Sequence, residues 1–129
     1  METFSREERL HSKPEIDELF SKGRSFKLFP FRVIFLPAPP ENRSPARLLI
    51  GVPAKYTRRA VDRNLIKRRI REAYRRNKSD FYLKLKKRNR KIHLALIYIS
   101  HDIVDYHSIE QKIIIILRRL VSDRNEDTG

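Results

Sequence analysis

The sequence predicts an α+β fold, a two-layer α/β sandwich in which helices pack on one small mixed β-sheet. Apolar, β-branched runs of strand length alternate with segments whose apolar residues recur at helical spacing, which favours this class. The chain has 129 residues, the size of one domain. It contains no cysteine, which excludes a disulfide scaffold, thiolate metal sites and cysteine nucleophiles. We therefore expect a single domain over residues 1–129, with residues 1–10 and 122–129 flexible.

The first element is expected to be a short helix that begins near residue 12. Ser12 and Glu15 have the spacing of a capping box, and Pro14 fits the first turn. One apolar stripe follows, formed by Ile16, Leu19 and Phe20. Gly23 is placed to end this helix in the left-handed conformation that glycine tolerates best.

Two strands are expected next. Residues 29–36 are aromatic and β-branched, and residues 47–52 are again apolar. The proline-rich residues 37–45 between them continue neither a strand nor a helix, so they are expected to form a loop. Neighbouring strands joined by such a loop most simply pair antiparallel. Residues 22–28 are the candidate for a further strand.

The second half of the chain predicts helix, strand and helix. Residues 60–77 show helical periodicity without glycine or proline, and the basic residues 78–91 either extend that helix or form a short one. Residues 92–100 are almost continuously apolar, as expected of a strand covered on both faces. Residues 108–121 have one apolar helical face and a capping box that begins at Ser108, which favours helix over strand.

The charge of the chain gives the first indication of function. There are 30 Lys and Arg residues against 16 Asp and Glu, a formal net charge of +14 at pH 7. This is well above the charge of about 2–8 that solubility needs, so a polyanion is the expected partner. Nucleic acid is the first candidate and an anionic membrane surface the second. No apolar run is long enough to span a membrane, and the first ten residues lack a signal-peptide pattern, so a cytoplasmic location is expected.

The densest charge lies in residues 55–76, where ten of twenty-two residues are Lys or Arg and two are acidic. At 100° per residue of helix, one row of cations comprises Arg63, Lys67, Arg71 and Arg75. The neighbouring row holds Asn64 and Arg68, and the side expected to face the sheet holds Ile66, Ile70 and Ala73. Arginine binds phosphate bidentately and asparagine reads a 2′-hydroxyl or a base edge, so this face fits RNA. The alternative is a solvated face whose charges pair with Asp62 and Glu72.

Residues 61–72 resemble the signature of the bacterial ribonuclease P protein component, the small basic subunit of a tRNA-processing ribonucleoprotein. The Arg63-Asn64, Lys67-Arg68 and Arg71-Glu72 pairs fall at the spacing of that family. The resemblance covers most of the chain. It includes Arg9-Leu10, Leu19-Phe20 followed by Lys22-Gly23, and residues 47–52 leading into Ala60-Val61.

The resemblance implies that this protein is not the catalyst. An RNA subunit with bound Mg²⁺ would cleave the 5′ leader from precursor tRNA, and the protein would bind both that RNA and the leader. It would bind no cofactor by itself and need neither a protein partner nor a membrane. The leader would lie in a cleft between the sheet and the first helix. The resemblance also implies a left-handed β-α-β crossover through the signature helix, where general rules favour a right-handed one.

The resemblance also implies roles for particular residues. The RNA-binding set would comprise Arg63, Asn64, Lys67, Arg68, Arg71, Arg75, Lys55, Arg58 and Arg59. The leader would contact Phe20 and Phe31, although aromatic residues in strands are more often buried in the core. Three positions depart from the family pattern. Residues 53–56 replace a Ser-Lys-Lys motif, Arg58 replaces a glycine, and Ile16 replaces an aromatic residue.

No residues with the pattern of a protein catalytic site or metal site stand out. The four histidines lack metal-ligand spacing, and His93 is expected to be structural because it lies in an apolar strand. Two other classes of function remain. A structural RNA-binding protein, such as a ribosomal component, would also be basic, but it need not carry the three signature pairs. Attachment to a membrane surface is weaker, because the apolar side of the basic helix lacks Trp and Phe.

Overall fold

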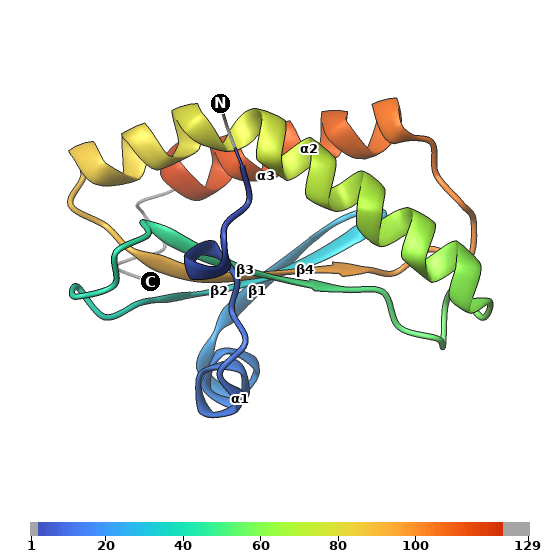
Figure 1. Ribbon diagram of the computed structural model, residues 1–129, viewed down its shortest axis with the longest axis horizontal. Coiled ribbons are helices and arrows are strands. Elements are labelled where there is room, and N and C mark those ends of the chain that lie inside the picture. Colours follow the sequence, from blue (N-terminus) through green and yellow to red (C-terminus); the bar gives the residue numbers. More distant parts are fainter. Residues whose placement is uncertain (1–2, 123–129) are drawn as a thin grey trace.

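The structure, a computed structural model, describes residues 3–122 and is built around one mixed sheet of four strands (Figure 1). The strands are β1 (Arg24–Leu28), β2 (Phe31–Pro37), β3 (Ala46–Gly51) and β4 (Ile92–Tyr98). The helices are α1 (Lys13–Lys22), α2 (Ala60–Lys87) and α3 (Tyr106–Ser122), preceded by a short 3₁₀ turn, η1 (Arg6–Glu8). The predicted α+β class, the strand in residues 22–28 and the helical reading of residues 108–121 are confirmed. The tail at residues 123–129, expected to be flexible, lies outside the described residues.

The helices cover the two faces of the sheet unequally. In Figure 1, α2 and α3 lie side by side on one face, while α1 lies alone on the other. The predicted sandwich of a mixed sheet and packed helices is therefore present, with α1 as a partial third layer. The chain passes along β3 in the foreground of Figure 1, returns through α2 above the sheet and enters β4 behind β3, which is the left-handed crossover.

The expected antiparallel pairing of residues 29–36 with residues 47–52 is wrong. The strand order is β1-β2-β4-β3, so β4 separates the two, pairing antiparallel with β2 and parallel with β3. The reason lies in the apolar character of β4, which is almost entirely buried and therefore belongs in the centre of the sheet. The loop between β2 and β3 crosses the end of β4 instead of making a hairpin.

Two apolar clusters hold the layers together, one on each face. The larger lies under α2 and α3 and includes Leu94, Leu96 and Tyr98 of β4. The smaller lies under α1 and contains Leu10, Leu19, Ile34 and Ala95. Each fully buried leucine or isoleucine contributes about 1.5–3 kcal/mol through apolar burial. Alternate residues of β4 thus serve opposite clusters, which explains its continuous apolar run.

The predicted helix ends differ in detail from the observed ones. Ser12 precedes α1 but makes no side-chain capping hydrogen bond. Gly23 follows α1 with φ −69° and ψ 155°, so its backbone is extended and the expected left-handed conformation is wrong. Glycine is needed there for space, because a Cβ atom would lie 2.4 Å from the carbonyl oxygen of Leu19. The last helix begins at Tyr106, two residues before the expected cap at Ser108.

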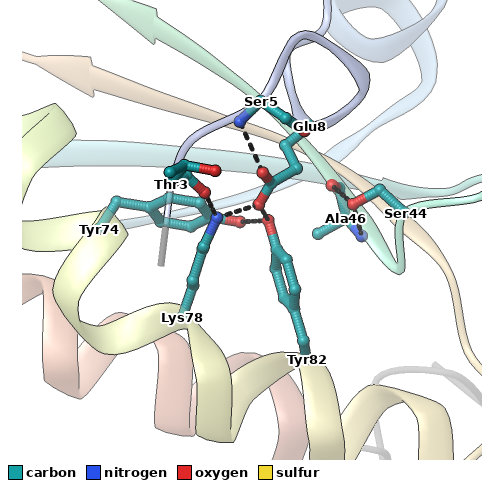
Figure 2. A network of polar contacts seen from close by, with 8 residues as sticks. All are labelled: Thr3, Ser5, Glu8, Ser44, Ala46, Tyr74, Lys78 and Tyr82. Carbon is teal, nitrogen blue, oxygen red and sulfur yellow. Dashed lines mark hydrogen bonds and ion pairs between the residues drawn. The ribbon is translucent and has the colours of Figure 1, made fainter. Parts of the chain in front are cut away.

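Residues 3–10, expected to be flexible from their composition, lie along α2 and the free edge of β3. The backbone amide of Leu10 donates to the carbonyl of Leu48 at 3.0 Å. Figure 2 shows the polar network that holds this segment: the Glu8 carboxylate accepts hydrogen bonds from Lys78, from Tyr82 at 2.9 Å and from the Ser5 amide at 2.7 Å. Glu8 and Lys78 are both buried.

The charge of Glu8 is stabilised within this network. Burial alone would raise the pKa of Glu8, but the hydrogen bonds from Lys78, the Ser5 backbone and Tyr82 together outweigh it and hold that pKa below its ordinary value. Burial also raises the pKa of Tyr82, so its hydroxyl remains a donor. The network is therefore an ion pair in which each polar atom has a partner, as burial of charge requires.

Candidate nucleic-acid interface

Helix α2 fixes the orientation of the cationic face. It runs for 28 residues without glycine or proline, and its apolar side is fully buried against the sheet and α3 at Ile66, Ile70 and Ala73. The orientation predicted from helical spacing is confirmed. The side turned away from the sheet carries Asn64, Arg68 and Arg71 in exposed positions. Because the buried side is anchored, these polar groups are held on a rigid support.

Arg68 and Arg71 keep their charges uncompensated. Within residues 3–122, neither guanidinium forms an ion pair with a carboxylate. Lys67, one turn before Arg71, is half-buried and also lacks such a pair in this part of the chain. The three cations, with Asn64 beside them, form a continuous polar surface. We call Asn64, Lys67, Arg68 and Arg71 the signature face.

Three residues of the predicted RNA-binding set form hydrogen bonds or ion pairs inside the protein: Arg63, Arg75 and Arg59, whose Nε lies 3.9 Å from the Asp62 carboxylate. The Arg63 guanidinium donates to the carbonyl oxygens of Thr57 at 3.0 Å and Arg58 at 2.5 Å, so it fixes the connector that precedes α2. Arg75 donates twice to the carboxylate of Glu72, at 3.0 and 2.7 Å. The hydrogen bond from Arg75 is the main reason that the pKa of Glu72 lies below its ordinary value. The charge of Arg75 is therefore compensated within the protein.

The connector between β3 and α2 adds a second group of cations. Lys55, Arg58 and Arg59 are all exposed there. They line a hollow together with Tyr56, Thr57, Asp62, His101 and Ile103. The Tyr56 and His101 rings lie 5.4 Å apart, and the Lys55 ammonium is 5.4 Å from the Tyr56 ring. The first residues of α2 have no side-chain cap, so their free N–H groups also favour an anion.

A groove at the free edge of β3 contains an arginine and a histidine that sequence reasoning did not assign to the interface. Arg9 and His11 approach Lys67 and Arg71 across this groove. Its apolar lining comes from Phe4, Leu10, Leu48, Leu49 and Ile50. The Arg9 guanidinium lies 5.0 Å from the centre of the Phe4 ring. No local pattern predicts this meeting, because it depends on how residues 3–10 dock on α2.

The two predicted leader-binding aromatic residues do not share a site. Phe20 lies on α1 and is 48% exposed. Phe31 is fully buried in the cluster under α2 and α3, where the centres of the Phe31 and Tyr98 rings lie 6.0 Å apart in an edge-to-face arrangement. The prediction that Phe31 lines a cleft beside the first helix is therefore wrong. The pleat of β2 turns Phe31, Val33 and Phe35 toward α2 and α3, and the alternate residues toward α1.

The face of the sheet that carries α1 has cations of its own. Lys27 of β1 and Arg32 of β2 are direct neighbours in the sheet register, and both are exposed. Ile97 and Gly51 continue the same row across β4 and β3. Sequence analysis missed Lys27 and Arg32, although the alternation of apolar and polar residues along β2 is the signal that places Arg32 opposite Phe31. Phe20, Lys27 and Arg32 are thus exposed on the α1 side.

The structure gives His93 a structural role, as expected. Its side chain is buried, and its Nε2 atom lies 3.2 Å from the side-chain nitrogen Nδ2 of Asn42. Burial is the main reason that the pKa of His93 lies below its ordinary value. Across residues 3–122, no group of three or more His, Cys, Asp or Glu side chains is arranged to hold a metal ion. In the same residues, no helix is long and apolar enough to cross a membrane.

Comparison with known proteins identifies relatives along most of the chain. The family described as Ribonuclease P matches residues 4–121. The ribonuclease P protein component of Porphyromonas gingivalis is 34% identical over 107 residues, which covers 83% of this chain and 78% of that protein. The protein of the same description from Petrotoga mobilis is 39% identical over 82 residues, covering 64% of this chain and 66% of that protein.

Solved structures share the fold. The RNase P protein from Thermotoga maritima superimposes with a TM-score of 0.69 at 26% identity, covering 87% of this chain and 96% of that chain. The Staphylococcus aureus RNase P protein also reaches a TM-score of 0.69, at 23% identity, with 86% and 93% of the two chains covered. Both comparisons agree with the mixed sheet and three helices described above.

Proposed function

The chain belongs to the family of ribonuclease P protein components, and from this premise we propose that its signature face binds a catalytic RNA and that its α1 side binds the 5′ leader of precursor tRNA. As a member, it is the protein subunit of ribonuclease P, with an RNA as its partner in an endoribonuclease that processes tRNA. We place this reaction in the cytoplasm.

The observation that carries the proposal is the exposed, uncompensated charge of the signature face. Arg68 and Arg71 stand on the rigid outer side of α2 without a carboxylate partner among residues 3–122. Like charges along one helix face repel each other, and phosphates between them remove that repulsion. Guanidinium groups bind phosphate bidentately, and the Asn64 amide beside them fits a 2′-hydroxyl or a base edge. Arg75 contributes less, because Glu72 already binds it.

The leader site is assigned to the α1 side of the sheet. Single strands bind to aromatic side chains that stack with bases and to cations that follow the backbone. Phe20 supplies an exposed ring, and Lys27 and Arg32 supply the charge on the same side. The buried Phe31 is not part of this site. Lys55, at the edge of the connector hollow, extends the positive charge toward the signature face.

The protein's contribution to cleavage is binding, and the chemistry is assigned to the RNA subunit with its Mg²⁺ ions. The catalytic RNA and the precursor tRNA are both polyanions and repel each other. A protein with a net charge of +14 between them lowers that repulsion. The RNA then needs less Mg²⁺ to bind its substrate. No second protein enters this scheme.

Cleavage of precursor tRNA by the cognate catalytic RNA tests the proposal. We expect the protein to lower the Mg²⁺ concentration needed for correct 5′ processing, while the protein alone cleaves nothing. The double variant Arg68→Gln/Arg71→Gln should lose most of this effect. Lys13→Gln on α1, an exposed lysine that pairs with Asp17, is the control and should keep it. Unchanged cleavage at low Mg²⁺ with the unaltered protein would refute the proposal.

A further inference from the structure

A second cluster of cations lies at the opposite end of α2 from the signature face. Residues 78–91 carry seven Lys or Arg and one Asp. The last turn of α2 and the turn that follows hold most of them. We call this cluster the distal patch, formed by Lys86, Lys87, Arg88, Arg90 and Lys91. At a rise of 1.5 Å per residue, Lys87 lies roughly 30 Å along the helix from Lys67.

Hydrogen bonds inside the protein orient the distal patch without neutralising it. The Arg90 guanidinium donates to the carbonyl of Leu120 at 3.2 Å, and Arg88 donates to the carbonyl of Val121. The Lys91 ammonium donates to the carbonyl of Pro40 at 2.6 Å. All these acceptors are uncharged, so the positive charges remain. These hydrogen bonds hold Arg88, Arg90 and Lys91 in fixed positions where the loop after β2, the end of α2 and the end of α3 meet.

Carboxylates compensate the cations around the distal patch but not the patch itself. Lys84 pairs with Asp80 at 3.0 Å, and Arg43 pairs with Glu7 at 3.1 Å. Lys86 and Lys87 are exposed. Among residues 3–122, no member of the distal patch forms an ion pair with a carboxylate. The patch therefore combines three exposed cations, Lys86, Lys87 and Arg88, with the half-buried Arg90 and Lys91.

The distal patch also borders a hollow. A depression of about 210 Å³ is lined by Arg43, Pro45, Lys86, Asn89, Arg90 and Lys91. These residues come from the loop after β2, the end of α2 and the turn before β4. The turn is made by Asn89, whose φ of 55° reverses the chain at the end of the helix. Lys86, Arg90 and Lys91, together with Arg43, thus surround a concave site assembled from segments far apart in the sequence.

The negative end of the helix dipole explains only part of this arrangement. Cations in a last helical turn are favourable, which accounts for Lys86 and Lys87. Lys91 and Arg43 lie outside the helix, yet they line the same hollow. Three cations of the distal patch, Lys86, Arg90 and Lys91, border this hollow without a carboxylate partner among residues 3–122, and such a concave cluster fits a chain of phosphates better than it fits solvent alone.

We propose that the distal patch is a second RNA-binding surface, which binds the phosphodiester backbone of the ribonucleoprotein's own RNA at a segment distinct from the one that meets the signature face. This inference rests on the proposed function, because it needs the same RNA partner. Helix α2 then acts as a rigid spacer that holds two RNA segments roughly 30 Å apart. The contacts read charge and shape, since lysine-rich surfaces bind phosphates without base specificity.

The salt dependence of binding tests the distal patch. We compare Lys86→Gln/Lys87→Gln with the control Lys13→Gln/Lys22→Gln, which removes two exposed lysines from α1 and changes the net charge equally. Affinity for the catalytic RNA alone is measured over a range of salt. The distal variant should flatten the slope of log affinity against log salt by about one for each lost contact, and the control should not. An equal change in both variants, or none in the distal variant, overturns the inference.

Directed RNA cleavage separates this inference from the proposed function. Because the chain has no cysteine, a single introduced thiol can carry a hydroxyl-radical probe at one known position. Val61→Cys marks the start of α2, Lys87→Cys the distal patch, and Lys13→Cys the control. We expect cuts from positions 61 and 87 in two different segments of the catalytic RNA and none from position 13. Cuts from position 61 alone overturn the distal contact and leave the proposed function standing, whereas cuts from neither overturn both.

Discussion

The two faces of the sheet differ in how completely helices cover them. On one face, α2 and α3 enclose an apolar cluster in which Phe31, Tyr74 and Tyr98 are fully buried. On the other, a helix of ten residues covers a cluster with only four buried residues. Lys27 and Arg32 remain exposed beside it. The same strands therefore stabilise the fold with one side and offer the other to a ligand.

The role of an aromatic residue in this protein therefore depends on which face of the sheet it occupies. Phe31 and Phe20 are both phenylalanines that the family resemblance places at the leader. Only Phe20 is exposed. We call the face of the sheet under α2 and α3 the closed face and the face under α1 the open face. The closed face also supports the cationic surface, because the outer side of α2 faces solvent only while its inner side stays packed on the sheet. Stability and binding can thus be separated by substitutions on opposite faces.

The largest effect is expected from Phe31→Ala. Removing a fully buried ring from the closed face leaves a cavity between the sheet and the helices, and should lower the free energy of unfolding by about 3–5 kcal/mol. Chemical denaturation would measure it. Phe29→Ala, at a ring that is 61% exposed, is the matched control and should change stability by less than about 0.5 kcal/mol. A stable Phe31→Ala protein with weakened leader binding would reverse our assignment of the two faces.

A somewhat smaller effect is expected from Glu8→Gln, which tests how residues 3–10 are held on the closed face. The buried Lys78 ammonium would lose its counter-charge, which should lower the free energy of unfolding by about 3 kcal/mol at neutral pH. Glu7→Gln is the neighbouring control. Its ion pair with Arg43 is exposed, so it should change stability by less than about 1 kcal/mol.

The pH dependence of the same variant gives a second readout. The pKa of Glu8 in the folded protein lies below its ordinary value of 4.5. The ionised carboxylate therefore contributes stability above pH 4.5, and this contribution is lost as pH falls through the lowered pKa. Denaturation at a series of pH values should show that loss in the unaltered protein and a smaller one in Glu8→Gln. Parallel pH profiles of the two proteins would contradict the ion pair.

Local patterns predicted much of the fold. The apolar spacing of residues 60–77 gave the inner side of α2, and the continuous apolar run in residues 92–100 gave a strand buried on both faces. The pairing of strands was not predictable in this way. It depends on β4 entering between two strands that precede it by more than forty residues, which no local pattern encodes. The same is true of the capping residues, where several polar side chains fit one helix end.

The candidate site likewise has features that local patterns predict and features that they do not. The exposed positions of Asn64, Arg68 and Arg71 follow from helix geometry, because one buried side fixes the other. The partners of Arg63 and Arg75 and the docking of Arg9 depend on side-chain choices or on contacts distant in sequence. The family resemblance alone places Phe31 at the leader, whereas the alternation of side chains along β2 puts Phe31 and Arg32 on opposite faces of the sheet.

The smallest effect on the fold, and the sharpest test of the open face, is expected from Phe20→Ala. The ring is 48% exposed, so stability should change by less than about 1 kcal/mol. Stacking of a base on an aromatic ring is worth about 1–3 kcal/mol, so preference for substrates with a leader over those without one should fall by roughly 5- to 150-fold. Binding of both substrates is measured with the reconstituted ribonucleoprotein. The double variant Lys27→Gln/Arg32→Gln should also weaken leader binding, but this effect should become smaller at high salt. The effect of Phe20→Ala should persist at high salt, because salt does not screen stacking. Equal losses for substrates with and without a leader would place Phe20 in the core and leave the open face without a ligand.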